Sequence, residues 1–354
     1  MSDYFSQLEE AMASAPSFDG MPARLVHLTN ANGMSVSLMD IGATWLSCVL
    51  PVKGKPREVL LRSPDMCEHM KQGAYFGSIV GRYANRIAKG QFTIGDHTYQ
   101  VGVNNGSNSL HGGLIGFDKR RWVIESQQHN RAIFVLHSAD GDQGYPGNLD
   151  IKVCYTLTDD NALHIDYYAE ADQITPVNLT NHAYFNLAGE NSDAKSIDHC
   201  LHMDADRYLP TSDDLIPTGE LRAVAGTSFD FTQSKVIGRD FLSDDDQNMA
   251  GGYDHAFIFA DGKNDGKETV VTLISPSKDV VMKVKTTKPA IQFYSGNFLA
   301  ETPGASRLYQ RYDGLALETQ YFPDGPNHPE WGKNNGLLNC GEHYQHQTTY
   351  LFEF

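Results

Sequence analysis

The sequence is short of positive charge. Its 354 residues include 28 lysines and arginines against 44 aspartates and glutamates, which gives a formal net charge of −16. Nucleic acids and anionic membrane surfaces bind proteins through basic faces, so this charge argues against both kinds of partner. We therefore expect a small-molecule ligand, with neither nucleic acid nor membrane as a partner.

Long apolar runs and a cysteine framework are also missing. No apolar run approaches the roughly 18 residues of a membrane-spanning helix, and residues 1–20 lack the basic and apolar regions of a secretory signal. The five cysteines are scattered and form no Cys-x-x-Cys pair, which argues against a disulfide framework and a structural zinc site. We expect free thiols and a cytoplasmic location.

Several common catalytic and cofactor motifs are absent. The sequence has no glycine-rich dinucleotide fingerprint, no Walker loop, no HExxH zinc motif and no Gly-x-Ser-x-Gly nucleophile turn. These absences argue against dinucleotide-dependent and nucleotide-hydrolysing enzymes, zinc peptidases and the α/β-type serine hydrolases.

The sequence is rich in short strand patterns. Residues 151–157 and 163–169 alternate apolar and polar side chains, and the polar turn 158–161 joins them, which predicts a hairpin. Similar runs occur at 131–138, 269–275, 280–286, 290–294 and 315–320. Because these strands do not alternate with long helices, the pattern predicts an all-β fold, either an antiparallel sandwich or a barrel.

Helical patterns are few and short. Residues 3–13 carry Tyr4, Phe5, Leu8 and Met12 roughly on one side, which is typical of a short amphipathic helix. A second candidate covers residues 239–247, whose acidic residues 244–246 we expect to be a solvated surface. We predict an N-terminal extension over residues 1–20 and a single β domain over residues 21–354.

Six segments combine polar, aromatic and glycine residues more densely than strand edges require. They are residues 81–87, 104–113, 178–187, 252–255, 292–297 and 317–324. Amide, guanidinium and carboxylate groups beside aromatic rings suit a neutral sugar, whose hydroxyls need paired donors and acceptors. The reactive side chains among them are His111, His182 and Glu318. Glu318 shares a strand face with Ala316 and Gln320, and that face could open to a cleft.

Taken alone, each of these residues also has an ordinary structural explanation. A metal site formed by the two histidines and a carboxylate is one alternative, although no closely spaced pair of ligands accompanies it. We expect no metal.

Together, the segments resemble the aldose 1-epimerase (galactose mutarotase) family. The strings that carry the resemblance are GRYANRIAKGQF, NNGSNSLHGG, NLTNHAYFNLAG, PTGE, GGYDHAF, IQFYSGNFL and LETQYFPDGPNHPEW. They occur in the order found in the family and run from about residue 81 to residue 331. The chain resembles the bacterial members most, and residues 1–20 carry none of the resemblance.

The resemblance implies a single large antiparallel β-sandwich, galactose mutarotase-like, that needs no cofactor. It implies that Glu318 is the catalytic base, that His182 is the catalytic acid, and that His111 binds substrate and assists at the ring oxygen. Further residues are implied to bind substrate or to form the walls of its pocket. The binding residues are Asn85, Arg86, Asp254 and Gln292, and the walls are Tyr184, Phe185, Asn105 and Tyr294.

The implied reaction interconverts the α- and β-anomers of a free hexose such as galactose or glucose. It requires Glu318 to be ionised and His182 to be protonated near neutral pH, and we expect their proximity to favour those states. Three alternatives remain open: a glycoside hydrolase or lyase that uses Glu318 and Asp254, a non-catalytic sugar-binding module, and a hexose-6-phosphate mutarotase with a basic pocket rim. We expect a monomer or a homodimer.

Overall fold

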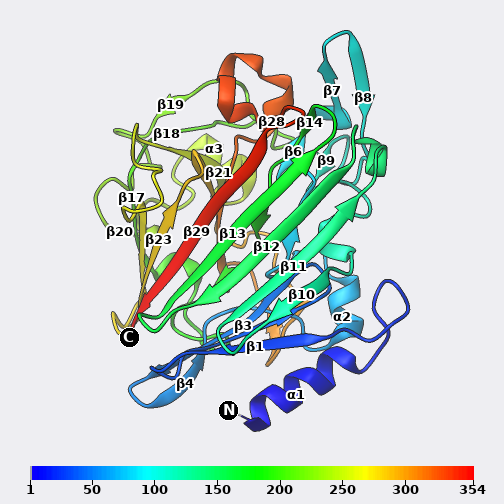
Figure 1. Ribbon diagram of the computed structural model, residues 1–354. Helices are drawn as coiled ribbons and strands as arrows, with labels where there is room; N and C mark the ends of the chain where they lie inside the picture. The colour runs from blue at the N-terminus through cyan, green and yellow to red at the C-terminus, as the bar shows by residue number, and fades with distance from the viewer. Residues whose placement is uncertain (1) are drawn as a thin grey trace.

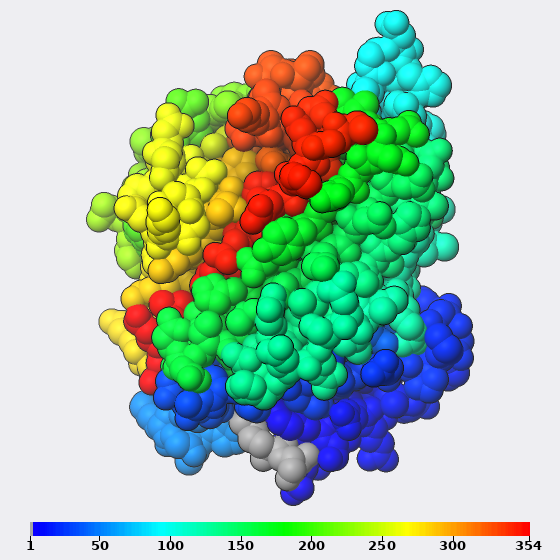
Figure 2. Space-filling view, viewed as in Figure 1, coloured from blue at the N-terminus to red at the C-terminus, as the bar shows by residue number. Residues whose placement is uncertain are grey.

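A nine-stranded antiparallel sheet forms the front of the molecule in Figure 1. The computed structural model describes residues 2–354. The strands, in their order across the sheet, are β10 (Val123–Gln127), β11 (Arg131–Ser138), β12 (Leu149–Leu157), β13 (Ala162–Ala171), β29 (His343–Glu353), β23 (Val281–Thr286), β22 (Val271–Ile274), β17 (Cys200–Met203) and β20 (Lys235–Val236). No helix formed by residues 2–354 covers its outer face in Figure 1, and Figure 2 shows the side chains of that face directly.

The strands predicted from alternation are present. The hairpin expected over residues 151–169 consists of β12 and β13, paired from Leu149↔Ala171 to Leu157↔Leu163. The runs at 131–138, 290–294 and 315–320 have the expected bounds, and those at 269–275 and 280–286 are slightly shorter strands. The prediction of an antiparallel all-β fold is confirmed.

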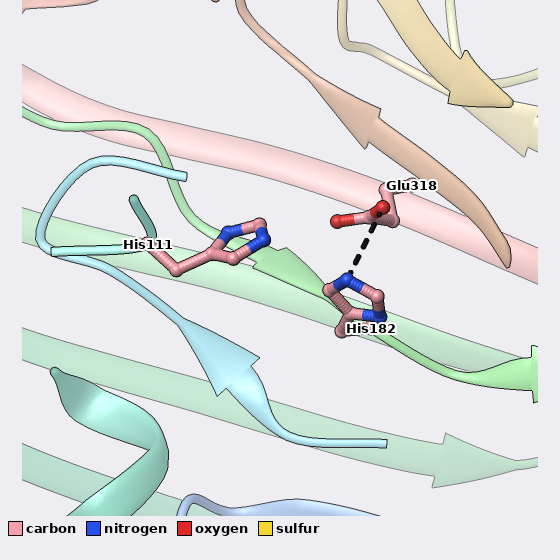
Figure 3. Close-up of side chains that lie close together, drawn as sticks. All are labelled: His111, His182 and Glu318. Atoms are coloured by element: carbon pink, nitrogen blue, oxygen red, sulfur yellow. Dashed lines mark ion pairs between the residues drawn. The ribbon is translucent and has the colours of Figure 1, made fainter. Parts of the chain in front are cut away.

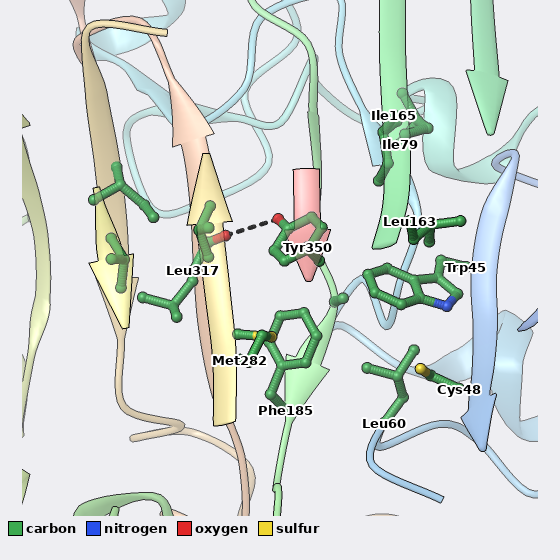
Figure 4. Packing of buried hydrophobic residues seen from close by; sticks show 14 of the residues in the cluster. Trp45, Cys48, Leu60, Ile79, Leu163, Ile165, Phe185, Met282, Leu317 and Tyr350 are labelled. Carbon is green, nitrogen blue, oxygen red and sulfur yellow. Dashed lines mark hydrogen bonds between the residues drawn. The ribbon is translucent and has the colours of Figure 1, made fainter. Parts of the chain in front are cut away.

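A six-stranded sheet packs behind the first. Its strands, in order, are β16 (Tyr184–Phe185), β27 (Leu315–Gln320), β24 (Ala290–Tyr294), β21 (Asp254–Phe259), β18 (Ala205–Tyr208) and β19 (Arg222–Ala223). Leu315 and Leu317 of β27 face the core shared by the two sheets. The hydroxyl of Tyr350, on β29, crosses this core and donates a hydrogen bond to the backbone oxygen of Leu317 at 3.0 Å, as Figure 4 shows. The fold is therefore a β-sandwich.

A smaller four-stranded sheet closes one end of the sandwich. It contains β1 (Leu25–Thr29), β2 (Ser35–Met39), β3 (Thr44–Val52) and β4 (Lys55–Glu58). Trp45 of β3 packs in the main core against Phe185 and Tyr350 (Figure 4), so this sheet shares the core of the sandwich.

The helices are short and peripheral. They are α1 (Ser2–Ala13), α2 (Met66–Lys71) and α3 (Asp245–Ala250). A helix is thus present where residues 3–13 predict one, and its Leu8 and Met12 are buried against Met39 and Ile41 beside the small sheet. None of the helices formed by residues 2–354 is long and apolar enough to cross a membrane.

The acidic residues 244–246 have structural roles at the start of α3. Asp244 is the N-cap residue, and its carboxylate accepts a hydrogen bond from the Gln247 backbone N–H at 3.1 Å. Asp246 accepts a hydrogen bond from the Tyr208 hydroxyl at 2.7 Å and forms an ion pair with Arg222 at 2.7 Å. The expectation of a solvated run is wrong for these two residues. The unpaired N–H groups of the helix start attract the carboxylate of Asp244, and Tyr208 and Arg222 bind that of Asp246.

Candidate active site

The predicted site residues surround one cavity of about 570 Å³ on the side of the six-stranded sheet that faces away from the core. This volume lies within the usual range for small-molecule sites, roughly 300–1,000 Å³. The seven residues predicted to act on substrate or to bind it all line this cavity, as does Tyr184 of the predicted walls; the seven are Asn85, Arg86, His111, His182, Asp254, Gln292 and Glu318. They come from sequence positions more than 200 residues apart, and the sandwich brings them together.

Glu318 reaches the cavity because of the alternation of β27. Leu315 and Leu317 point into the core, so Ala316 and Glu318 point to the opposite face. Glu318 lies directly across from Gln292 on β24, and it is only 2% exposed. The predicted face of Glu318 is therefore correct, and a carboxylate that would be a surface group on an outer strand is buried at the floor of the cavity.

His182 lies next to Glu318 and is fixed by its backbone. It follows β15 (Thr180–Asn181), which pairs with β5 (Ile79–Val80). The His182 N–H donates to the backbone oxygen of Ser78, and the His182 oxygen accepts from the Gly77 N–H, both at 2.9 Å. Its Nε2 atom is 3.5 Å from Glu318 Oε1 (Figure 3). The candidate acid and the candidate base are thus neighbours in a rigid part of the fold.

His111 points toward the same two side chains, as Figure 3 shows. The backbone N–H of Asn85 donates a hydrogen bond to His111 Nδ1 at 3.1 Å, and the His111 N–H donates to the Asn85 oxygen at 3.1 Å. Because Nδ1 accepts a hydrogen bond, the proton of the neutral ring lies on Nε2. A protonated His111 would direct an N–H at the Asn85 N–H, so this geometry favours His111 as a neutral hydrogen-bond donor.

The four predicted binding residues form a connected polar group. Gln292 Nε2 donates to Asp254 Oδ1 at 2.7 Å, and Arg86 Nη2 lies 3.7 Å from Asp254 Oδ2. Arg86 also donates from Nε to Asn105 Oδ1 at 3.2 Å. The Asn85 side chain accepts from the Arg86 backbone N–H at 2.8 Å. These contacts orient amide, guanidinium and carboxylate groups at the cavity wall.

Burial sets the protonation states of the candidate acid and base. It lowers the pKa of His182 to about 4, because a buried imidazolium loses its hydration. It raises the pKa of Glu318 well above its ordinary value, with Asp254 adding to the rise and Arg86 opposing it. These shifts run against the expectation that proximity would favour an ionised Glu318 and a protonated His182, because burial has the largest effect on both groups.

The ligand atoms of His111, His182 and Glu318 all lie within 4.8 Å of one another. Such a group could hold a metal ion. However, a metal at His111 Nε2 would displace the proton that the hydrogen bond from Asn85 places there. The hydrogen bonding of His111 therefore suits proton transfer and sugar binding better than metal ligation.

Tyr184 and Phe185 are adjacent in sequence, but only Tyr184 lines the cavity. Tyr184 lines the cavity, as predicted, and its ring stacks on His182 with centroids 5.1 Å apart. Phe185, predicted as a second wall, is instead fully buried in the main core. The prediction for Phe185 is wrong, because neighbouring residues of a strand point to opposite faces. Asn105 and Tyr294 both line the cavity, as predicted.

Tyr75, which was not predicted from the sequence, also lines the cavity. Its ring lies 4.6 Å from His111 and 5.8 Å from His182, measured between centroids. The one signal in the sequence is an aromatic pair between two glycines, Gly73 and Gly77, which by itself indicates only a turn. The acidic residues Asp213 and Asp214 and the exposed Phe298, all at the cavity mouth, were missed as well.

Comparison with known proteins gives one consistent result. The model of the aldose 1-epimerase family matches residues 24–351. The aldose 1-epimerase of Escherichia coli K12 is 48% identical over 98% of this chain and 99% of its own length. The galactose mutarotase of Mus musculus is 41% identical over 90% of this chain and 91% of its own. A solved structure of an aldose epimerase homologue from C. elegans has a TM-score of 0.84 and 29% identity, covering 94% of this chain and 99% of its own.

The resemblance extends further than the sequence motifs indicate. The bacterial match leaves 2% of the chain uncovered, which is fewer than twenty residues, so it reaches into residues 1–20. The family model itself begins at residue 24, so residues 1–20 lie outside the family resemblance, as expected. The stronger similarity to a bacterial member than to a mammalian one is as predicted.

Proposed function

The chain belongs to the aldose 1-epimerase family, and on that premise we propose that it interconverts the α- and β-anomers of free hexoses, galactose and glucose among them. In this proposal Glu318 is the base and His182 is the acid, while His111, Arg86 and Asp254 bind the sugar. A cytoplasmic location and a monomeric or dimeric state stay predictions.

The observation that carries the proposal is a set of buried, unpartnered polar atoms on three of the side chains that line the cavity. Glu318 Oε2, Gln292 Oε1 and His182 Nδ1 are buried and have no hydrogen-bond partner among residues 2–354. Unpartnered buried polar atoms are costly, so such a group indicates a ligand that completes it. Acceptors and donors beside the ring of Tyr184 match the hydroxyls and the C–H face of a neutral sugar.

The chemistry needs an acid and a base at two oxygens bound to one carbon. Glu318 removes the proton of the C1 hydroxyl while His182 protonates the ring oxygen, and the bond between C1 and the ring oxygen breaks to give the open-chain aldehyde. Rotation about C1–C2 presents the other carbonyl face, and ring closure returns both protons. Two side-chain groups 3.5 Å apart can reach these two oxygens together. General acid and base groups each contribute roughly 10²–10⁴-fold.

Burial itself favours an arrangement of the pair that holds one proton, with Glu318 protonated and His182 neutral, because it raises the pKa of Glu318 and lowers the pKa of His182. Transfer of that proton to His182 produces the carboxylate and the imidazolium without any exchange with solvent. Sugar hydroxyls that donate to the Glu318 carboxylate, and Arg86 nearby, would favour this charged arrangement. The roles reverse on ring closure, so no net proton is consumed.

The charges at the cavity favour an unphosphorylated sugar. Its ionisable lining includes the carboxyl groups of Asp213, Asp214, Asp254 and Glu318 against one arginine, Arg86. A phosphate group at this mouth would meet repulsion, which argues against the hexose-6-phosphate alternative. Asp254 is held by Gln292 and lies near Arg86, so it is poorly placed to act as the second free carboxyl group that a glycoside hydrolase requires.

Polarimetry on freshly dissolved α-D-galactose, in buffer with a chelator, tests the proposal. The protein should accelerate relaxation to the same final rotation that the sugar reaches alone. The same assay with α-D-glucose ranks the two sugars, and α-D-glucose 6-phosphate serves as the anionic comparison. An unchanged relaxation with both free sugars, in a sample shown to be folded, would contradict the proposed function. Faster relaxation only for the phosphate ester would contradict the assignment of an unphosphorylated substrate.

A further inference from the structure

The imidazole of His182 lies against two tyrosine rings that are nearly parallel to it. The ring of Tyr184 is 5.1 Å away with an interplanar angle of 26°, and the ring of Tyr75 is 5.8 Å away with an angle of 27°. Tyr75 also meets His111 edge-on at 4.6 Å. The Tyr75 ring is therefore in contact with the rings of both histidines of the site, and it comes from a different segment of the chain.

The segment of Tyr75 is tied to His182 through the backbone. It connects α2 to β5, and the residues that follow Tyr75 exchange two hydrogen bonds with His182, from Gly77 N–H and to the Ser78 oxygen. The Tyr75 oxygen itself accepts from the Ser78 N–H at 3.0 Å. The position of the Tyr75 ring relative to the imidazole is thus set by short, direct connections.

Tyr75 adopts a backbone conformation that does not suit its side chain. Its φ is +58°, in the left-handed region that bulky residues adopt at a cost. Glycine or asparagine would fit there more easily. A large aromatic residue in this position indicates that its ring has a use at the site, because strained backbone persists where the surroundings or the function maintain it.

We propose that Tyr75 is a positioning residue for His182, the proton donor of the proposed reaction: its ring fixes the plane of the imidazole and stabilises the protonated form through its π face. Aromatic faces attract cations, and the attraction is larger where water is excluded. Burial opposes the imidazolium that the reaction needs, and the neighbouring ring faces offset part of that penalty. The kinetic consequences of this inference rest on the proposed function, whereas its structural consequence does not.

We expect the aromatic ring of Tyr75, and not its hydroxyl, to stabilise the protonated form of His182. Burial raises the pKa of the Tyr75 hydroxyl, as does the nearby Asp118, so the phenol stays neutral around neutral pH. Phenylalanine would keep the aromatic face and should substitute for tyrosine. The titratable and charged groups near His182 are those of Glu318, His111, Tyr75 and Tyr184, with Arg86 and Asp254 beyond Glu318.

The kinetic test compares Tyr75→Leu with Tyr75→Phe. Both side chains meet the same left-handed backbone, so the pair isolates the ring. We expect Tyr75→Leu to lower kcat about 10-fold with KM changed less than about 3-fold, and Tyr75→Phe to stay within about 2-fold of the parent. A loss confined to KM would place Tyr75 against the sugar and overturn the assignment to His182. In a His182→Asn background, Tyr75→Leu should cost no further activity, and an undiminished loss would overturn it as well.

A titration without substrate separates this inference from the proposed function. In a Glu318→Gln background, which removes the coupled carboxyl group, the proton affinity of His182 can be followed by NMR, with His182→Asn assigning the signal. Tyr75→Leu should lower that affinity about 3- to 10-fold relative to Tyr75→Phe. Equal affinities would overturn the inference even if the protein is a mutarotase, and a clear difference would support it even if no anomerisation is found. If Tyr75→Leu does not fold, Tyr75→Asn, which tolerates the positive φ, replaces it under the same criteria.

Discussion

The two sheets of the sandwich follow the same alternation of residues but use their polar faces in different ways. On β13, in the nine-stranded sheet, the polar positions His164, Asp166 and Glu170 face outward and are partly or fully exposed. On β27, in the six-stranded sheet, all six residues are buried, including Glu318. These polar residues of β13 meet water, whereas Glu318 of β27 meets the cavity.

This difference explains why the site lies where it does. A carboxyl group on the outer sheet keeps its hydration and costs little, while Glu318 loses hydration and leaves one oxygen unpartnered. Burial of that kind raises the pKa of a carboxyl group, and such shifts are common where a residue takes part in chemistry. We infer that the six-stranded sheet holds reactive groups at a cost in stability. The outer face of the nine-stranded sheet carries no such cost, and that sheet stabilises the fold.

The same kind of substitution on both sheets tests most directly whether carboxyl groups on the two sheets have different roles. Glu318→Gln should lower kcat/KM by about 10³-fold or more, because it removes the base while keeping the shape of the side chain. Asp166→Asn on β13, whose carboxylate accepts a hydrogen bond from Gln347, should leave the rate within about 2-fold. Polarimetry gives both rates, and NMR detection of bound galactose should show that the Glu318 variant still binds sugar. A near-normal rate for Glu318→Gln would remove it as the base.

Substitution of histidines at the site and on the nine-stranded sheet gives a second test, with a smaller expected loss of activity. His182→Asn should lower kcat by about 10²-fold or more, since it removes the acid. His111→Asn should affect both kcat and KM, because in the proposed reaction His111 is a neutral donor that holds the sugar in both the ground state and the transition state. His164→Asn, on the outward face of β13, is the matched control and should change neither constant. Full activity of His182→Asn would reassign the acid to His111.

Local patterns predicted a large part of this molecule. Alternation in residues 315–320 placed Glu318 on the correct face, and alternation in 151–169 predicted the β12–β13 hairpin with its turn. The same rule, applied strictly to Tyr184 and Phe185, would have sent Phe185 to the core, so that error was avoidable. The family motifs supplied the remaining site residues, which no spacing rule could bring together across the sheets.

Other features depend on contacts that no local pattern contains. Tyr75 reaches the two histidines only because β5 pairs with β15, far away in sequence. The role of Asp244 depends on where α3 begins, and the role of Asp246 depends on Arg222, which lies on β19. The protonation states of His182 and Glu318 depend on how deeply the sandwich buries them, and the residue types alone indicate the opposite direction.

The buried histidine of β21 is expected to affect stability rather than catalysis. His255 on β21 of the six-stranded sheet is fully buried, and burial lowers its pKa to about 4 from an ordinary value of 6.5. Between these values the unfolded chain binds a proton that the folded chain does not. The stability that neutral His255 contributes is therefore complete above pH 6.5 and is lost progressively as the pH falls to 4.

His255→Asn should remove this share of the acid sensitivity. Urea unfolding at a series of pH values should show the slope of the unfolding free energy against pH reduced by about 1.4 kcal/mol per pH unit in that window, or about 3 kcal/mol across it. His137→Asn, on β11 of the nine-stranded sheet, is the control, because its side chain is 57% exposed and remains hydrated in the folded protein. If both variants keep the parent slope, His255 is not among the groups that make the folded state acid-sensitive. If both reduce it equally, burial does not distinguish the two sheets, and the contrast between them would hold for catalysis alone.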